Sequence, residues 1–173
     1  VLIEQDYNYG TGDPVYHQTP RLKAKDSKGG YFVLKDAKGG NPDTRAELDT
    51  AAFADTKAGW VDFVAKADTL DNLLADPNAN WNQISQIIDV DSFVKMFFVY
   101  EFTENQEIAR SSVHFYRDGP TDKIHAGPVW DFDVAMGNFD DSLTGRGGNP
   151  EVDYVANVVT WRPDGKGSDW FPQ

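Results

Sequence analysis

The chain has 173 residues, of which 28 are acidic and 16 basic, so its formal net charge at pH 7 is -12. Hydrophobic residues make up 40% of the sequence and aromatic residues 13%, which suits one globular domain and argues against disorder. The charge disfavours binding to nucleic acid or to anionic membranes, and a sequence without cysteine has no thiol catalysis, zinc-thiolate site or disulfide.

The first forty residues predict strands and turns. The chain opens on the apolar run Val1–Ile3 without an initiator Met or a leader-like segment, and the apolar run Tyr31–Leu34 follows a Gly-Gly turn. Its last residues, Trp170–Gln173, resemble the start of a further element. We therefore expect residues 1–173 to be a single but partial domain of a longer protein.

The next stretch changes from a strand pattern to a helix pattern. Apolar residues recur at spacings of three and four from about residue 44 to residue 75, which predicts a helix, and we expect a break near Gly59. Residues 76–80 contain Pro and Asn and predict a loop. The loop separates this helix from a short helix through residues 84–88.

A second long helix is predicted over residues 92–104. Asp89 or Asp91 is the expected N-cap, because a carboxylate there accepts hydrogen bonds from the first backbone N–H groups of a helix. The segment is apolar on almost every face, which is typical of a helix buried at the centre of a domain. We therefore expect it to support rigidly the polar loop that follows it.

A β-hairpin is predicted between two polar loops. Residues 113–117 and 124–130 have strand-like composition and flank the turn at 118–122. A polar loop, 104–112, precedes the hairpin, and the acidic run Trp130–Asp133 follows it. The order of helix, loop, hairpin and acidic loop predicts that the two loops lie close together in space.

The acidic run contains two candidate metal ligands. In an extended segment alternate side chains share a face, so Asp131 and Asp133 would present two carboxylates to one hard cation such as Mg²⁺. The alternative is that both are solvated surface acids in an acidic chain. A calcium-binding EF-hand is excluded, because the sixth position counted from Asp131 is Met136 instead of glycine.

Three further polar residues have a structural interpretation and a functional one. His114 and His125 are expected to face each other across the hairpin, and partial burial in the strands is favoured over a two-histidine metal site. Asn105, at the end of the second long helix, is expected to orient the following loop by bonding to backbone.

Several segments together resemble the CotH (spore coat protein H) kinase family. They are residues 88–94, 100–105, 110–116 and 123–138. The opening strand also resembles a Tyr-Leu-Leu-Glu run of that family, and Trp170-Phe171 resembles the start of its C-terminal helical part. The resemblance touches most of the chain, with a looser match over residues 7–80.

The resemblance implies an α+β, atypical protein-kinase-like fold. This chain would comprise mainly the C-terminal-lobe portion, with a central buried helix and a β-hairpin between two acidic loops. The resemblance also implies that the N-terminal lobe and the C-terminal helices of the family are missing from it. The implied activity is transfer of the γ-phosphoryl group of ATP to Ser or Thr of a secreted, cell-surface or spore-coat protein. The implied cofactors are ATP and Mg²⁺ or Mn²⁺, with Ca²⁺ as an alternative, and the partner is a protein phosphoacceptor. No apolar run approaches the roughly 20 residues that a membrane-spanning helix needs.

The resemblance also assigns roles to residues of the two loops. Asp131 resembles the metal-binding Asp of a kinase Asp-Phe-Gly loop, and Asp133 would be a second ligand or an orienting acid. Glu107 falls where the family often has a catalytic Asp, and Ser112 falls where it often has a metal-binding Asn. Both are departures from the family pattern. A carboxylate shifted by about 1 Å can cost roughly 10²-fold in rate.

Nucleotide binding is assigned by the resemblance to Glu4 and Gln5. A kinase also needs a lysine that holds the α- and β-phosphates; Lys35 lies in a strand-like run, but no motif singles it out. The departures at the catalytic loop motivate an alternative, a non-catalytic scaffold module of an extracellular multidomain protein.

A third class, a carbohydrate-binding or hydrolysing domain, rests on four tryptophans with scattered carboxylates. They are Trp60, Trp81, Trp161 and Trp170. Core packing is the favoured interpretation of Trp60 and Trp81, because both lie on or beside apolar helix faces.

Overall fold

The structure is a computed structural model that describes residues 1–6, 21–23, 31–103, 105, 112–133 and 135–136. Its elements in chain order are β1 (Leu2–Asp6), β2 (Arg21–Lys23), β3 (Tyr31–Asp36), α1 (Arg45–Leu48), the 3-10 helix η1 (Ala51–Phe53), α2 (Ala54–Ala75), α3 (Trp81–Ile87), α4 (Val90–Phe102), β4 (Val113–Tyr116) and β5 (His125–Ala126). Helices beside a small antiparallel sheet agree with the predicted α+β class, and the early strands and later helices fall where the sequence pattern places them.

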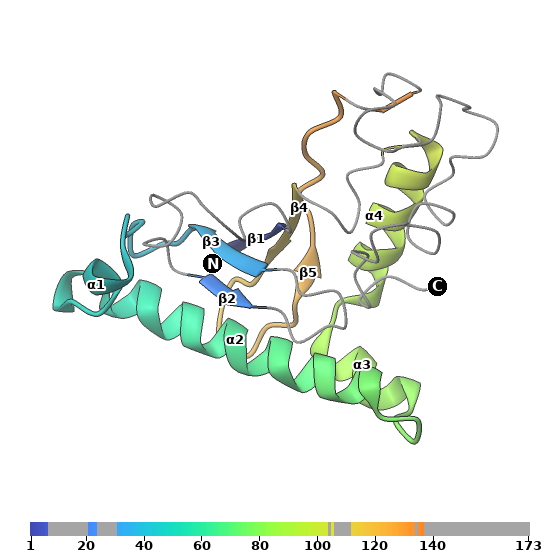
Figure 1. Cartoon of the computed structure of the whole chain (residues 1–173). Coiled ribbons are helices and arrows are strands. Elements are labelled where there is room, and N and C mark those ends of the chain that lie inside the picture. The colour runs from blue at the N-terminus through green and yellow to red at the C-terminus, as the bar shows by residue number, and fades with distance from the viewer. Residues whose placement is uncertain (7–20, 24–30, 104, 106–111, 134, 137–173) are drawn as a thin grey trace.

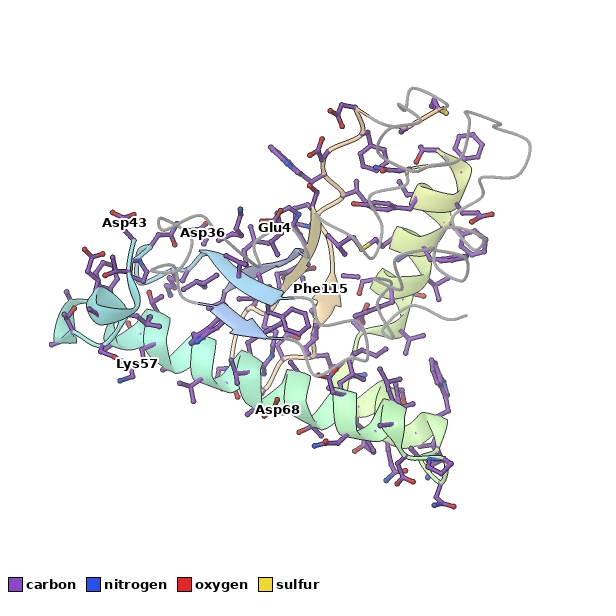
Figure 2. The ribbon with its side chains drawn as sticks, viewed as in Figure 1. Glu4, Asp36, Asp43, Lys57, Asp68 and Phe115 are labelled. Atoms are coloured by element: carbon purple, nitrogen blue, oxygen red, sulfur yellow. The ribbon has the colours of Figure 1, made fainter. Side chains whose placement is uncertain are left out.

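The sheet has an apolar face and a polar face. Its strand order is β2-β3-β1-β4-β5, and each neighbouring pair is antiparallel. Ile3 on β1 pairs with Phe115 on β4 and with Leu34 on β3, and all three side chains are buried. The next residue, Glu4, pairs with His114 and points to the other face, because side chains alternate along a strand. Figure 2 shows Glu4 and Phe115 on opposite sides of the sheet.

Helix α2 covers the apolar face of the sheet, and the core lies between them (Figure 1). The Phe32 ring on β3 meets the Phe63 ring on α2 edge-on at a centroid distance of 5.6 Å. Phe115 on β4 stacks on Phe93 of α4 at 5.7 Å. Phe115 thus packs β4 against α4, and its ring also meets that of Phe32, which packs on α2, edge-on at 6.3 Å. Strand β4 begins one residue after Ser112.

The predicted break near Gly59 is wrong. Helix α2 runs without interruption through Gly59, and the irregular turn lies earlier, between α1 and α2. A Cβ atom at position 59 would lie 2.8 Å from Cγ1 of Val1, so glycine lets the start of the chain pass close to the helix. The burial of Trp60 and Phe63 next to it outweighs the cost of about 1 kcal/mol that glycine carries within a helix.

The expectation that the second long helix is buried on all sides is wrong for one face. Helix α4 buries Phe93, Met96 and Tyr100, but Val94, Phe98 and Phe102 are exposed. Its core-facing side follows helical periodicity, and the remaining apolar residues fall on the opposite side. Among the described residues, no helix has the length and apolar character needed to cross a membrane.

The two tryptophans expected in the core differ in burial. Trp60 is buried and stacks on Phe63 at a centroid distance of 6.4 Å, which confirms the core prediction for this residue. Trp81 is 59% exposed, so the prediction is wrong there. It begins α3, a seven-residue helix that buries none of its residues. Trp161 and Trp170 lie outside the described residues.

Asp89 is the N-cap of α4, which resolves the choice between Asp89 and Asp91. Its Oδ1 accepts a hydrogen bond from the Ser92 N–H at 2.9 Å, and the Ser92 hydroxyl donates to the Asp89 carbonyl. The pKa of Asp89 lies below its ordinary value, chiefly because of the Ser92 N–H bond. The pKa of Asp122 is also lowered, chiefly by its hydrogen bond with His125.

We expect Asp89→Asn to flatten the acid dependence of stability. A carboxyl group whose pKa is lowered by folding stabilises the protein fully above its unfolded pKa of about 4, and this contribution is lost as the pH falls through the lowered value. Asparagine still accepts the Ser92 N–H bond but does not titrate. The melting temperature, followed by circular dichroism from pH 6 downward, should fall less steeply in the variant. An unchanged slope would contradict the assignment.

Candidate functional site

The two predicted loops meet at Asp131. The Ser112 hydroxyl donates to Asp131 Oδ2 at 3.1 Å, and the Asn105 side-chain amide donates to the Asp131 carbonyl at 2.9 Å. Ser112 and Asn105 are the described residues of the loop that precedes the hairpin, and Asp131 belongs to the loop that follows it. The predicted proximity of the two loops is therefore confirmed for these residues, as is the bonding of Asn105 to backbone.

The acidic loop is fastened to the C-terminal end of α4. The buried Tyr100 donates its hydroxyl to the Trp130 carbonyl at 3.3 Å, and its ring lies 5.1 Å from the Phe132 ring. Further along, the Met136 N–H donates to the Thr103 carbonyl at 2.6 Å. The helix therefore holds the loop on both sides of Asp131.

Ser112 and Asp131 both adopt left-handed backbone conformations. Their φ angles are 58° and 61°, a region that costs a residue with a Cβ about 1–2 kcal/mol. Such conformations persist where the surroundings impose them, often at functional sites. Asp131 therefore does not have the extended backbone from which a shared face with Asp133 was expected, and its Oδ2 accepts the Ser112 hydroxyl bond.

The hairpin is confirmed, with a shorter second strand than predicted. Strand β5 contains only His125 and Ala126, and after Gly127 the chain leaves the sheet through a cis Gly127–Pro128 peptide. Pro128 has no backbone N–H with which to continue the ladder, and the φ of Gly127, 128°, lies outside the strand region. The departure carries Asp131 away from the sheet edge and toward Ser112.

The two histidines do not face each other. His125 pairs with Tyr116, stacks on its ring at 4.8 Å, and lies 3.0 Å from Asp122 Oδ1. His114 points to the polar face, where its Nδ1 lies 3.1 Å from the Ser112 carbonyl. Burial lowers the pKa of His114, and the negative charge of Glu4 opposes that shift. The described residues therefore form no two-histidine metal site.

Glu4 pairs with a lysine that no sequence motif singles out. The carboxylate of Glu4 is buried, and its Oε2 lies 2.5 Å from the Lys35 ammonium, an ion pair between β1 and β3. Lys35 follows the core residue Leu34 in a strand, so the alternation of side chains was the available signal for the face on which Lys35 lies, but the pairing of β3 with β1 was not visible in the sequence. Gln5 pairs through its backbone with Phe32 and Val113.

Two further residues predicted for the site are Asp133 and Glu107. Asp133 is exposed, two residues beyond Asp131. Glu107, the predicted catalytic carboxylate, lies outside the described residues. Within the described part of the chain, no three His, Asp or Glu side chains gather as a ready-made metal site. Any metal here would take part of its coordination shell from phosphates and water, as Mg²⁺ commonly does.

The oxygen atoms of Ser112 and Asp131 suit one hard cation. Mg²⁺ binds oxygen at about 2.1 Å, so neighbouring ligands in its octahedral shell lie about 3.0 Å apart. The Ser112 hydroxyl and Asp131 Oδ2 are 3.1 Å apart, and both atoms are of the type that Mg²⁺ and Mn²⁺ prefer. The donor set present therefore fits Mg²⁺ or Mn²⁺.

Comparison with known proteins supports the family resemblance. A family model described as CotH kinase protein matches residues 23–163, well over half of the chain. No curated protein and no solved structure matches the chain. The matched region includes the hairpin and both loops that meet at Asp131. On the extent of this match, the chain belongs to the CotH kinase family.

Proposed function

We propose that the protein transfers the γ-phosphoryl group of ATP, with Mg²⁺ or Mn²⁺, to Ser or Thr residues of a secreted, cell-surface or spore-coat protein. Membership of the CotH kinase family indicates a kinase-like function in general. The observation that carries the finer proposal is the convergence of Ser112 and Asn105 on Asp131. Phosphoryl transfer asks the protein mainly to position metal, phosphates and acceptor, and these contacts provide a fixed oxygen-donor site.

In this proposal Asp131 and Ser112 hold the metal. Asp131 contributes a carboxylate oxygen, Ser112 contributes its hydroxyl oxygen, and Asp133 supplies a further carboxylate nearby in the chain. When bound, the metal neutralises charge that develops on the transferring phosphoryl group. Asn105 holds the Asp131 carbonyl and so fixes the backbone that carries the Asp131 carboxylate. The carboxylate is therefore positioned before the metal binds.

The proposed nucleotide contacts lie at β1 and β3. Glu4 and Gln5 remain the proposed nucleotide-binding residues, and Lys35 joins them because its ammonium is already oriented by Glu4. A lysine held by a glutamate is the arrangement with which protein kinases contact the ATP phosphates. Glu4 lies opposite His114, whose ring contacts the Ser112 carbonyl, so the ion pair and the proposed metal site are linked across the polar face.

Glu107 is the proposed acceptor-orienting carboxylate. The oxygen of a Ser or Thr hydroxyl attacks the γ-phosphorus, its proton passes to the Glu107 carboxylate, and the bond to the β-phosphate oxygen breaks to release ADP. The alternative is a scaffold module without catalysis, motivated by Glu107 and Ser112 standing where the family often has Asp and Asn.

Incubation of the purified protein with γ-labelled ATP, Mg²⁺ and Ser/Thr peptides separates the two candidates. We expect metal-dependent label on Ser or Thr, which is lost in Glu107→Gln and retained in Glu107→Asp. Nucleotide binding without transfer by the wild type would favour the scaffold. Equal transfer by the wild type and Glu107→Gln would remove Glu107 from the mechanism.

We expect Ser112→Ala to weaken Mn²⁺ binding by roughly 10-fold or more, because it removes one oxygen ligand and the hydrogen bond that orients Asp131. Ser112→Asn should retain binding, since Asn tolerates a φ of 58° and offers an amide oxygen. Electron paramagnetic resonance of free Mn²⁺ measures both. Ser85→Ala on α3, whose hydroxyl bonds to the Asn82 carbonyl within that helix, is the matched control. Wild-type affinity in Ser112→Ala would exclude Ser112 as a ligand.

A further inference from the structure

The two left-handed residues of the candidate site are held in the same way. The Asp131 carbonyl accepts a hydrogen bond from the Asn105 amide at 2.9 Å, and the Ser112 carbonyl lies 3.1 Å from His114 Nδ1. Asn105 is 0% exposed and His114 is 7% exposed. The carbonyl of each left-handed residue is thus hydrogen-bonded to a buried side chain. The side chains of Ser112 and Asp131 are in turn hydrogen-bonded to each other.

The Ser112 contact defines the tautomer of His114. A carbonyl oxygen has only lone pairs, so the proton of this hydrogen bond must lie on Nδ1. An Nδ1–H tautomer is therefore the form that fits the structure.

The imidazole is fixed by what surrounds it. The backbone of His114 pairs with Glu4 on β1, and the His114 carbonyl accepts the Gly127 N–H at 2.8 Å. The ring meets the Trp130 ring edge-on at a centroid distance of 6.3 Å. His114 therefore contacts the residue next to Asp131 while it bonds to Ser112, and it connects both halves of the site to the rigid sheet.

We propose that His114 is a positioning residue of the metal site. Its Nδ1–H holds the Ser112 carbonyl, keeps Ser112 in the left-handed conformation, and so places the Ser112 hydroxyl against Asp131. The inference deepens the proposed function and rests on it where metal binding is concerned. His114 itself contacts neither metal nor substrate in this role.

Mn²⁺ titration of three variants tests the proposal. His114→Leu removes the donor and keeps an apolar side chain of comparable size, and it should weaken Mn²⁺ binding about 10- to 100-fold, as loss of a residue that orients a metal ligand commonly does. His114→Asn restores a side-chain N–H near the Nδ1 position and should recover most of the affinity. His125→Leu, at the other described histidine, should leave the affinity unchanged. Equal loss in His114→Leu and His114→Asn, or no loss in His114→Leu, would overturn the proposal.

A second measurement does not depend on metal binding. Two-bond ¹H–¹⁵N spectra of the wild type should show His114 protonated on Nδ1, and the Ser112 and Asp131 amide signals should move in metal-free His114→Leu and return toward wild type in His114→Asn. An Nε2–H tautomer would overturn the proposal even if His114→Leu does not fold. If the wild type binds no Mn²⁺ but the spectra show the Nδ1–H proton and the expected amide shifts, the proposed metal site fails. The part of the proposal in which His114 holds the Ser112 carbonyl then stands.

Discussion

Asp131→Asn should reduce phosphoryl transfer by roughly 10²- to 10³-fold, the range seen when a group that stabilises transition-state charge is removed. The substitution replaces an anionic metal ligand by a neutral amide. It should leave the fold intact, because asparagine still accepts the Ser112 hydroxyl bond and the carbonyl at this position remains bonded to Asn105. Initial rates with γ-labelled ATP at saturating Mg²⁺ measure the effect.

The matched control for this prediction is Asp118→Asn. Asp118 is an exposed residue of the hairpin turn, so the variant removes the same charge without touching the site. Its rate should stay close to that of the wild type. Comparable losses in both variants would indicate a general charge effect, and full activity in Asp131→Asn would remove Asp131 from the mechanism.

Arg117→Met should destabilise the fold strongly. The Arg117 side chain is 2% exposed, and its guanidinium donates to the Asp62 carboxylate and to the Pro120 and Asp122 carbonyls. Methionine fills part of the space but leaves these acceptors without their donor. Breaking a buried ion pair from one side costs about 3–5 kcal/mol, and we expect about 3 kcal/mol because the Asp62 side chain is 35% exposed and water can reach it.

Urea unfolding of Arg117→Met and Lys95→Met measures this contrast. Lys95 pairs with Asp91 at 2.9 Å on the exposed surface of α4, one helical turn away, and surface pairs of this kind contribute little. The unfolding midpoint should fall clearly in Arg117→Met and stay in place in Lys95→Met. Equal midpoints in the two variants would show that the buried guanidinium does not organise the hairpin and α2.

Local features of the fold were predictable from sequence. The Asp89 cap depends on residues within one turn, and the hairpin depends on a turn signal flanked by strand-like segments. The meeting of the loops around Asp131 followed from the order of elements along the chain. These predictions succeeded because each depends on neighbouring residues or on simple chain connectivity.

Features that depend on distant segments were not predictable. The Lys35–Glu4 pair requires the register of β3 against β1, and the role of His114 requires a left-handed Ser112. Gly59 was expected to break α2 because its close contact with Val1 cannot be seen from local helix propensity. Sequence patterns thus identified Asp131, Ser112 and Asn105, whose side chains or carbonyls meet at the candidate site, and missed the contacts of His114 and Lys35.

The most direct test of the proposed metal–nucleotide site is calorimetric titration of the protein with ATP in the presence of Mg²⁺, repeated with Asp131→Asn. Asp131 lies where both loops meet, and its carboxylate is the anionic donor of the pair formed with Ser112. We predict that the wild type binds ATP in a Mg²⁺-dependent manner and that Asp131→Asn loses this dependence. Equal Mg²⁺-dependent binding by both proteins would contradict the account and place the metal elsewhere in the chain.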